Sequence, residues 1–209
     1  SRKIADPARA AVLVQLEQAR ARLDAWASLQ AHQRAQGWRL VAAEIDLDST
    51  RCRIEVPEGE MGLSGRIDRI DYNEQTERWR LLDYKTGDSG KTPEQDHRKG
   101  PKNSKSWVKL QLPLYLQFAH QLEIDGLTRQ SEMETGFCLL PASPEETRIE
   151  IATWSPEDLE VARELSEATV SEILSGPEQP LSVLKTPWQR AFAGTTVESA
   201  SRLDGIADK

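Results

Sequence analysis

The sequence has only two cysteines among its 209 residues, and it has no apolar run long enough to cross a membrane. A membrane helix needs roughly 18 or more mostly apolar residues, so we set a membrane role aside. Cys52 and Cys138 each lie in an apolar, strand-like run, which predicts two small buried side chains. Two cysteines cannot build a four-cysteine zinc site or an iron–sulfur cluster, and we expect a reducing, cytoplasmic setting.

Positive charge is also scarce, because 27 Lys and Arg stand against 34 Asp and Glu, for a formal net charge of −7. A protein that coats nucleic acid needs clustered Lys and Arg to neutralise phosphates, so any contact with nucleic acid must be local. The chain begins at Ser1 without Met and without a sequence typical of a signal peptide. We therefore expect a piece of a longer protein, with one domain over residues 1–180 that lacks an N-terminal helical part, and a tail over 181–209.

Hydrophobic periodicity predicts an α/β chain. Apolar residues spaced three and four apart from Val12 to Leu29 indicate an amphipathic helix, and Asp6 and Ser155, each before a proline, are typical helix N-caps. Helices are predicted over 7–36, 107–122 and 156–174. Strands are predicted over 38–47, 52–56, 61–72, 78–85, 134–140 and 148–154. The first two strands are predicted to form a hairpin with its turn at 48–50. This order predicts one mixed β-sheet flanked by α-helices.

Two aspartates fall on the strands on either side of a polar turn. The midpoint between Asp68 and Asp83 lies within the turn at 73–77, so in a regular hairpin the two residues sit opposite each other and project from the same face. Lys85 lies two positions beyond Asp83 and joins that face. Two acids and one lysine are thus predicted to share a patch of the sheet.

The chemistry of this patch favours a bound cation. Two opposed carboxylates repel each other unless a cation lies between them, and Mg²⁺ typically accepts one or two carboxylates together with waters and phosphate oxygens. An ammonium group nearby can stabilise negative charge on a phosphate. The patch therefore predicts metal-assisted hydrolysis of a phosphodiester.

Four sequence elements occur in the order of a known family: Glu44, GRIDRID (65–71), LLDYKTG (81–87) and QLPLY (111–115). Their joint order resembles the RecB-like branch of the PD-(D/E)XK nucleases, over roughly residues 38–121. The resemblance implies a restriction-endonuclease-like α/β fold. It departs at two points. His32 stands too close to Glu44 to match the helical histidine that many relatives carry, and the sequence lacks the four cysteines that hold an iron–sulfur cluster in some relatives.

The resemblance assigns roles to individual residues. Asp68 and Asp83 resemble the two catalytic aspartates, Lys85 resembles the lysine of the D-x-K element, and Glu44 resembles the upstream acid. Gln111 and Tyr115 resemble the Q-x-x-x-Y pair, and residues i and i+4 of a helix lie on one face. The implied catalytic set is Glu44, Asp68, Asp83, Lys85, Gln111 and Tyr115, with Glu44, Asp68 and Asp83 holding Mg²⁺ or Mn²⁺.

By the same resemblance we expect a metal-dependent deoxyribonuclease, more specifically an exonuclease acting on single-stranded or duplex DNA ends. Its expected setting is DNA recombination or double-strand-break repair, with a helicase domain or subunit as partner. A catalytically inactive nuclease-like scaffold that binds DNA or docks proteins stays open as an alternative, and so does a hydrolase of RNA or of another phosphoester.

Blander interpretations of single residues stay open as well. An isolated D-x-K on a strand is usually a solvent-facing ion pair. Glu44 shares its side of the strand with Asp46 and Asp48, which is the pattern of an ordinary solvent-exposed face. Gln111 and Tyr115 fit a helix that packs on the core, and His97 has no spaced partner, which predicts a surface or half-buried position.

The segment from Arg98 to Lys109, RKGPKNSKSWVK, has five basic residues and no acid. It is either a solvated loop or a nucleic-acid contact, and its place between the D-x-K strand and the Q-x-x-x-Y helix favours contact. The candidate DNA-binding residues are Arg98, Lys99, Lys102, Lys105 and Lys109.

Overall fold

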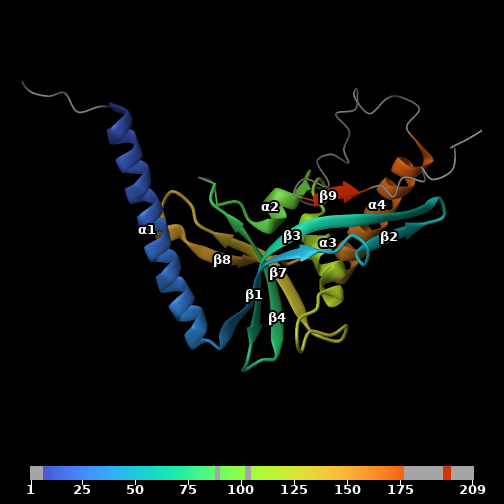
Figure 1. Ribbon diagram of the computed structural model, residues 1–209, viewed down its shortest axis with the longest axis horizontal. Helices are drawn as coiled ribbons and strands as arrows, with labels where there is room; N and C mark the ends of the chain where they lie inside the picture. The colour runs from blue at the N-terminus through green and yellow to red at the C-terminus, as the bar shows by residue number, and fades with distance from the viewer. Residues whose placement is uncertain (1–6, 88–89, 102–104, 177–194, 199–209) are drawn as a thin grey trace, which may run out of the picture.

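A computed structural model describes residues 7–87, 90–101, 105–176 and 195–198. Its centre is a mixed sheet in the order β1-β3-β4-β7-β8, in which β4 and β7 are parallel and the other neighbours are antiparallel (Figure 1). These strands are β1 (Trp38–Leu47), β3 (Gly59–Asn73), β4 (Arg78–Lys85), β7 (Met133–Leu139) and β8 (Arg148–Ile151). The predicted mixed sheet with flanking helices is confirmed.

The predicted hairpin between the first two strands is wrong. β1 pairs with β3 over Gly65–Asn73, and β2 (Arg53–Val56) pairs with β3 over Gly59–Gly62, so each strand uses a different stretch of the same neighbour. This is possible because β3 is 15 residues long. The hairpin is instead β2–β3, with its turn at Pro57 and Glu58. In the predicted tail, β9 (Thr195–Glu198) adds to β3 at Gly62–Gly65.

Helices cover both faces of the sheet. The larger core lies beneath α3 (Gln111–Phe118) and α4 (Pro156–Ser175), and a smaller one lies beneath α1 (Pro7–Ala35), which runs alone along the other side (Figure 1). Both cysteines are buried, as predicted. Short elements fill the connections: α2 (Pro93–His97), β5 (Arg98–Lys99), β6 (Ser106–Trp107), η1 (Ala119–Gln121) and η2 (Pro144–Glu146).

Helix α4 begins as its sequence predicts. The Ser155 side chain accepts a hydrogen bond from the backbone N–H of Asp158, and the Asp158 carboxylate accepts one from the N–H of Ser155, which is a complete capping box. The expected cap of α1, Asp6, lies outside the described residues. Among the described helices, none has the length and apolar character needed to span a membrane.

Helix α1 packs on the sheet mainly through polar contacts. Asp71, fully buried on β3, accepts hydrogen bonds from Arg69 at 2.7 Å and from Arg80 at 2.9 and 2.8 Å. The two guanidinium groups also donate to the side-chain oxygens of Gln30 and Gln33 on α1, at 2.8 and 2.7 Å. These contacts are confined to the C-terminal half of the helix.

The N-terminal half of α1 does not bury the apolar face that its periodicity predicts. Val12, Leu16 and Leu23 are each more than half exposed, and only Trp26 is buried, in edge-to-face contact with Tyr84. The apolar periodicity correctly predicts the helix. Whether the apolar face of the helix is buried depends on how far the sheet extends beneath it.

Candidate active site

The β3–β4 hairpin brings the two aspartates together. Its paired register runs from Asn73 opposite Arg78 to Arg69 opposite Leu82, so Asp68 and Asp83 are the next residues of the two strands just beyond the last pair, in agreement with the predicted register. The Asn73 side chain stabilises the turn by accepting hydrogen bonds from the N–H groups of residues 75 and 76. Asp68 Oδ2 also accepts a 2.7 Å hydrogen bond from the backbone N–H of Tyr84, which ties the two strands together at the site.

The Asp83 carboxylate is almost completely buried, with 5% of the residue exposed. Burial raises its pKa, and the nearby Asp68 adds to the rise, while the ammonium group of Lys85 opposes it. Lys85 Nζ lies 2.6 Å from Asp83 Oδ2 as an ion pair, and that buried oxygen has no aligned hydrogen bond. A buried carboxylate oxygen in this state is well suited to accept a cation.

Helix α3 completes the arrangement around Asp83. Gln111 donates from Nε2 to Asp83 Oδ1 at 2.9 Å and to the Tyr115 hydroxyl at 3.3 Å. That hydroxyl in turn donates to the backbone carbonyl of Arg66 on β3 at 2.9 Å. Gln111 therefore contacts the acid pair directly, and Tyr115 is linked to it through Gln111. The Tyr115 ring is also 1% exposed within the core, so it packs in the core and contacts the site at once.

His97 anchors the start of α3, and its predicted surface or half-buried position is wrong. The side chain is fully buried, packed against Phe137 and Trp154. Its Nδ1 lies 3.2 Å from the Pro93 carbonyl and its Nε2 lies 3.4 Å from the N–H of Leu112. Burial lowers its pKa to about 4, so it is neutral and Nε2 can accept the Leu112 hydrogen bond.

Glu44 does not converge with the two aspartates. Its neighbours in sequence, Ala43 and Ile45, pair with Arg69 and Ile67, so Glu44 occupies the position across from Asp68. Its φ of 54° is rare for a residue other than glycine and takes it out of regular strand geometry. The side chain is 64% exposed and its carboxylate lies 3.6 Å from Arg66.

The donor set therefore offers two carboxylates rather than the predicted three. Among the described residues, no group of three or more His, Cys, Asp and Glu side chains is placed to hold a metal ion. Asp68 and Asp83 still fit Mg²⁺ or Mn²⁺, because such ions are commonly held by one or two carboxylates plus water and phosphate oxygens. The buried Oδ2 of Asp83 supports that fit.

The predicted DNA-binding segment is largely neutralised by acids. Arg98 pairs with Asp158 at 2.8 Å, and Lys105 pairs with Glu94 at 2.9 Å. Lys109 contacts both carboxylate oxygens of Asp96, at 2.9 and 2.8 Å, while Lys99 donates to the carbonyl of Gln95. Lys102 lies outside the described residues. Of the four described candidate residues, Arg98, Lys105 and Lys109 are therefore paired with acids.

Sequence patterns missed one residue beside the site. Arg66 contacts Asp46 at 2.7 Å and Glu44 at 3.6 Å, and its carbonyl receives the Tyr115 hydroxyl. The only available signal was its place inside the GRIDRID element, two residues before Asp68.

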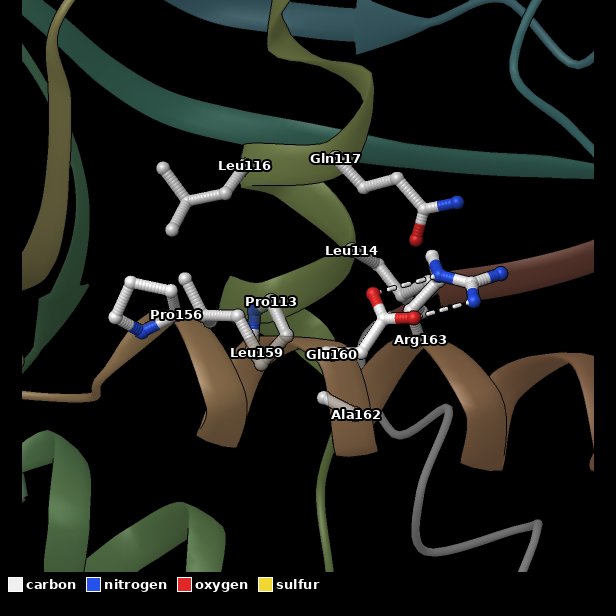
Figure 2. A pocket seen from close by; sticks show the side chains of 9 residues that line it. All are labelled: Pro113, Leu114, Leu116, Gln117, Pro156, Leu159, Glu160, Ala162 and Arg163. Carbon is white, nitrogen blue, oxygen red and sulfur yellow. Dashed lines mark hydrogen bonds and ion pairs between the residues drawn. The ribbon is translucent and has the colours of Figure 1, made fainter.

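The acid pair is separate from a hollow of about 360 Å³ that lies between α3 and α4. Figure 2 shows this hollow lined mostly by apolar side chains such as Leu116, Pro156 and Leu159, with the Glu160–Arg163 ion pair at its edge. None of the candidate site residues lines it. Its lining has no acid pair or lysine that resembles the site on β3 and β4.

Comparison with known families decides the relationship. A family model described as the PD-(D/E)XK nuclease superfamily matches residues 2–185, which is most of the chain and includes every candidate site residue. The chain belongs to the PD-(D/E)XK nuclease superfamily. No curated protein and no solved structure matches it. Membership explains the combination of Asp68, Asp83 and Lys85 in a D…D-x-K order on adjacent strands, and PD-(D/E)XK nucleases generally use divalent metal ions.

Proposed function

We propose that the chain is a RecB-like nuclease domain that hydrolyses DNA phosphodiesters with Mg²⁺ or Mn²⁺. The observation that carries this proposal is the placement of Asp68 and Asp83 at the same end of the β3–β4 pairing, with Lys85 at 2.6 Å from the buried carboxylate. The order of the four sequence elements favours the RecB-like branch within the superfamily.

Each side chain has a role in the proposed reaction. Asp68 and Asp83 hold the divalent cation, which when bound supplies a Lewis acid and a water of lowered pKa. Lys85 places a positive charge beside the scissile phosphate, where negative charge develops. Gln111 fixes the orientation of Asp83 through its 2.9 Å hydrogen bond, and Tyr115 holds Gln111. Glu44 acts as a third, outer acid that neighbours Asp68 on β1.

The same resemblance supports a finer biological proposal. The domain acts as an exonuclease on single-stranded or duplex DNA ends in recombination or double-strand-break repair in the cytoplasm. A helicase domain or subunit supplies the unwound strand.

The alternative of an inactive scaffold predicts binding without cleavage. It is disfavoured by the intact set of Asp68, Asp83, Lys85 and Gln111, because a decayed site has no need for a buried carboxylate whose charge destabilises the fold.

The test incubates the protein with labelled single-stranded DNA, duplex DNA and RNA, each with Mg²⁺, Mn²⁺ or EDTA. We expect DNA degradation that needs the divalent ion and falls by roughly a thousandfold or more in Asp83→Asn and Lys85→Ala. Asp125→Asn is a matched control, because Asp125 is exposed and lies in the connection before β7, away from the site. DNA binding without cleavage supports the scaffold, and cleavage of RNA alone contradicts the deoxyribonuclease proposal.

A further inference from the structure

A small hollow opens beside the end of β4, and Lys85 forms part of its lining. It measures about 150 Å³, which is room for a phosphate group with several waters, since one water needs only about 10–15 Å³ of such space. Its lining consists of Lys85, Gly87, Lys91, Asp96, Lys109 and Phe137.

Three ammonium groups and one carboxylate line the hollow. Lys109 is paired with both oxygens of Asp96 and Lys85 is paired with Asp83, so the lining cation that no described acid balances is Lys91. Lys91 is exposed and has no acidic partner within the part of the chain that the structure describes. An ammonium group carries three hydrogen-bond donors, so Lys91 can bind an anion.

The rest of the lining holds Lys85 in place. Its Nζ lies 4.9 Å from the centre of the Phe137 ring, which forms an apolar wall, and 2.6 Å from Asp83. Lys85 therefore belongs to both the hollow and the acid pair. A ligand in the hollow must lie directly next to a phosphate bound at Asp68 and Asp83.

We propose that this hollow is a second phosphate subsite, in which Lys91 and Lys109 bind the phosphate adjacent to the one that is cleaved. The proposal rests on the proposed nuclease function. Lysine binds phosphate as a compact point charge, and two occupied subsites would fix one strand across Lys85. The bound group is either an internal phosphodiester or a terminal phosphate of the strand, and these two sources share the same chemistry.

The test compares wild type, Lys91→Ala and Lys91→Arg on short single-stranded DNAs that each carry one neutral methylphosphonate. In wild type, neutralising the scissile phosphate should abolish cleavage, and neutralising one neighbouring phosphate should reduce cleavage by more than about tenfold. In Lys91→Ala, cleavage of unmodified DNA should fall roughly tenfold, and neutralising that neighbouring phosphate should cause a smaller loss than it does in wild type, because only Lys109 still binds it. Lys91→Arg should behave as wild type, and so should the control Arg129→Ala, an exposed cation in the connection before β7.

Two further measurements distinguish a terminal from an internal phosphate, and a failure of the subsite proposal from a failure of the nuclease proposal. The same DNAs with and without terminal phosphates show whether the neighbour is terminal or internal. Binding measured by fluorescence anisotropy in EDTA should show a salt dependence that is lower by about 0.7 per lost phosphate contact in Lys91→Ala. Cleavage that is unchanged in Lys91→Ala overturns the subsite alone. Binding that depends on Lys91 without any cleavage overturns the nuclease proposal alone, and no binding or cleavage overturns both.

Discussion

Asp83 holds a charged group where burial disfavours charge. Its pKa is raised by burial, and only Lys85 and Gln111 oppose the rise. A folded-state pKa above the ordinary value of 3.8 means that this residue favours the folded state below that value. The benefit is lost as the pH rises through the raised pKa, so at neutral pH the charge of Asp83 destabilises the fold.

Replacing Asp83 by Asn should therefore increase stability while it removes activity. Asn keeps an oxygen for the Gln111 hydrogen bond and carries no charge, so we expect a gain of about 1 kcal/mol, or roughly 2–4 °C in Tm. Thermal unfolding at pH 7 measures the gain, and it should vanish when both proteins are unfolded near pH 3.5. A loss of stability at pH 7 would show that the charge of Asp83 is compensated.

Glu44 lies on β1 across from Asp68, outside the regular strand geometry, and the two acids have different partners. Asp68 is tied to β4 through the Tyr84 N–H, whereas Glu44 is exposed beside Arg66. We expect Asp68→Asn to reduce metal-dependent cleavage by roughly a hundredfold or more, and Glu44→Gln by less than about tenfold. Initial rates over a Mg²⁺ titration measure both effects. Equal losses would mean that Glu44 turns inward when the metal binds.

At the scale of elements, the position of α3 depends on a neutral histidine. His97 accepts the Leu112 N–H next to Gln111, and its pKa of about 4 lies below the ordinary 6.5. A lowered folded-state pKa means that the contribution of His97 to stability is complete above pH 6.5 and is lost as the pH falls toward 4. The full loss is about 3 kcal/mol, at about 1.4 kcal/mol per pH unit.

His97→Gln should remove this part of the pH dependence, because glutamine does not titrate. Urea unfolding of the two proteins at pH 7, 5.5 and 4.5 measures the difference. Wild type should lose more stability than the variant across this range, and parallel curves would contradict the burial of a neutral His97.

The sequence predicted the β3–β4 register because the turn supplies its own geometry through Asn73, and the hydrophobic alternation on both sides agrees with it. It could not predict the backbone of Glu44, since its positive φ has no signal in residue type. It also could not predict that the basic segment is neutralised, because Arg98 meets Asp158 sixty positions away. Such pairs depend on how elements pack, and neither charge runs nor periodicity encode that.

At the scale of the whole molecule, α1 is joined to the sheet by a buried charged cluster. Arg69, Asp71 and Arg80 lie on the face opposite Asp68 and are each at most 5% exposed. Tyr84, the residue between Asp83 and Lys85, donates its N–H to Asp68 and contacts Trp26 of α1 with its ring. The strand that carries the site is thus packed from both sides.

Removing the central acid of this cluster should destabilise the whole domain. Asp71→Asn leaves two buried guanidinium groups without their charge partner, at a cost of about 3–5 kcal/mol. Asp46→Asn is the control, because the Asp46–Arg66 pair is exposed and solvent screens it, so its loss should change stability far less. Chemical denaturation measures both, and a similar small loss in the two variants would contradict the proposed role of the cluster.

The central claim is that Asp68 and Asp83 together hold a divalent cation beside Lys85. Its most direct test is anomalous diffraction from crystals of the protein soaked in Mn²⁺. We predict a peak within about 2.3 Å of a carboxylate oxygen of each aspartate. A peak elsewhere, or no peak while Lys85 stays paired with Asp83, would contradict the account.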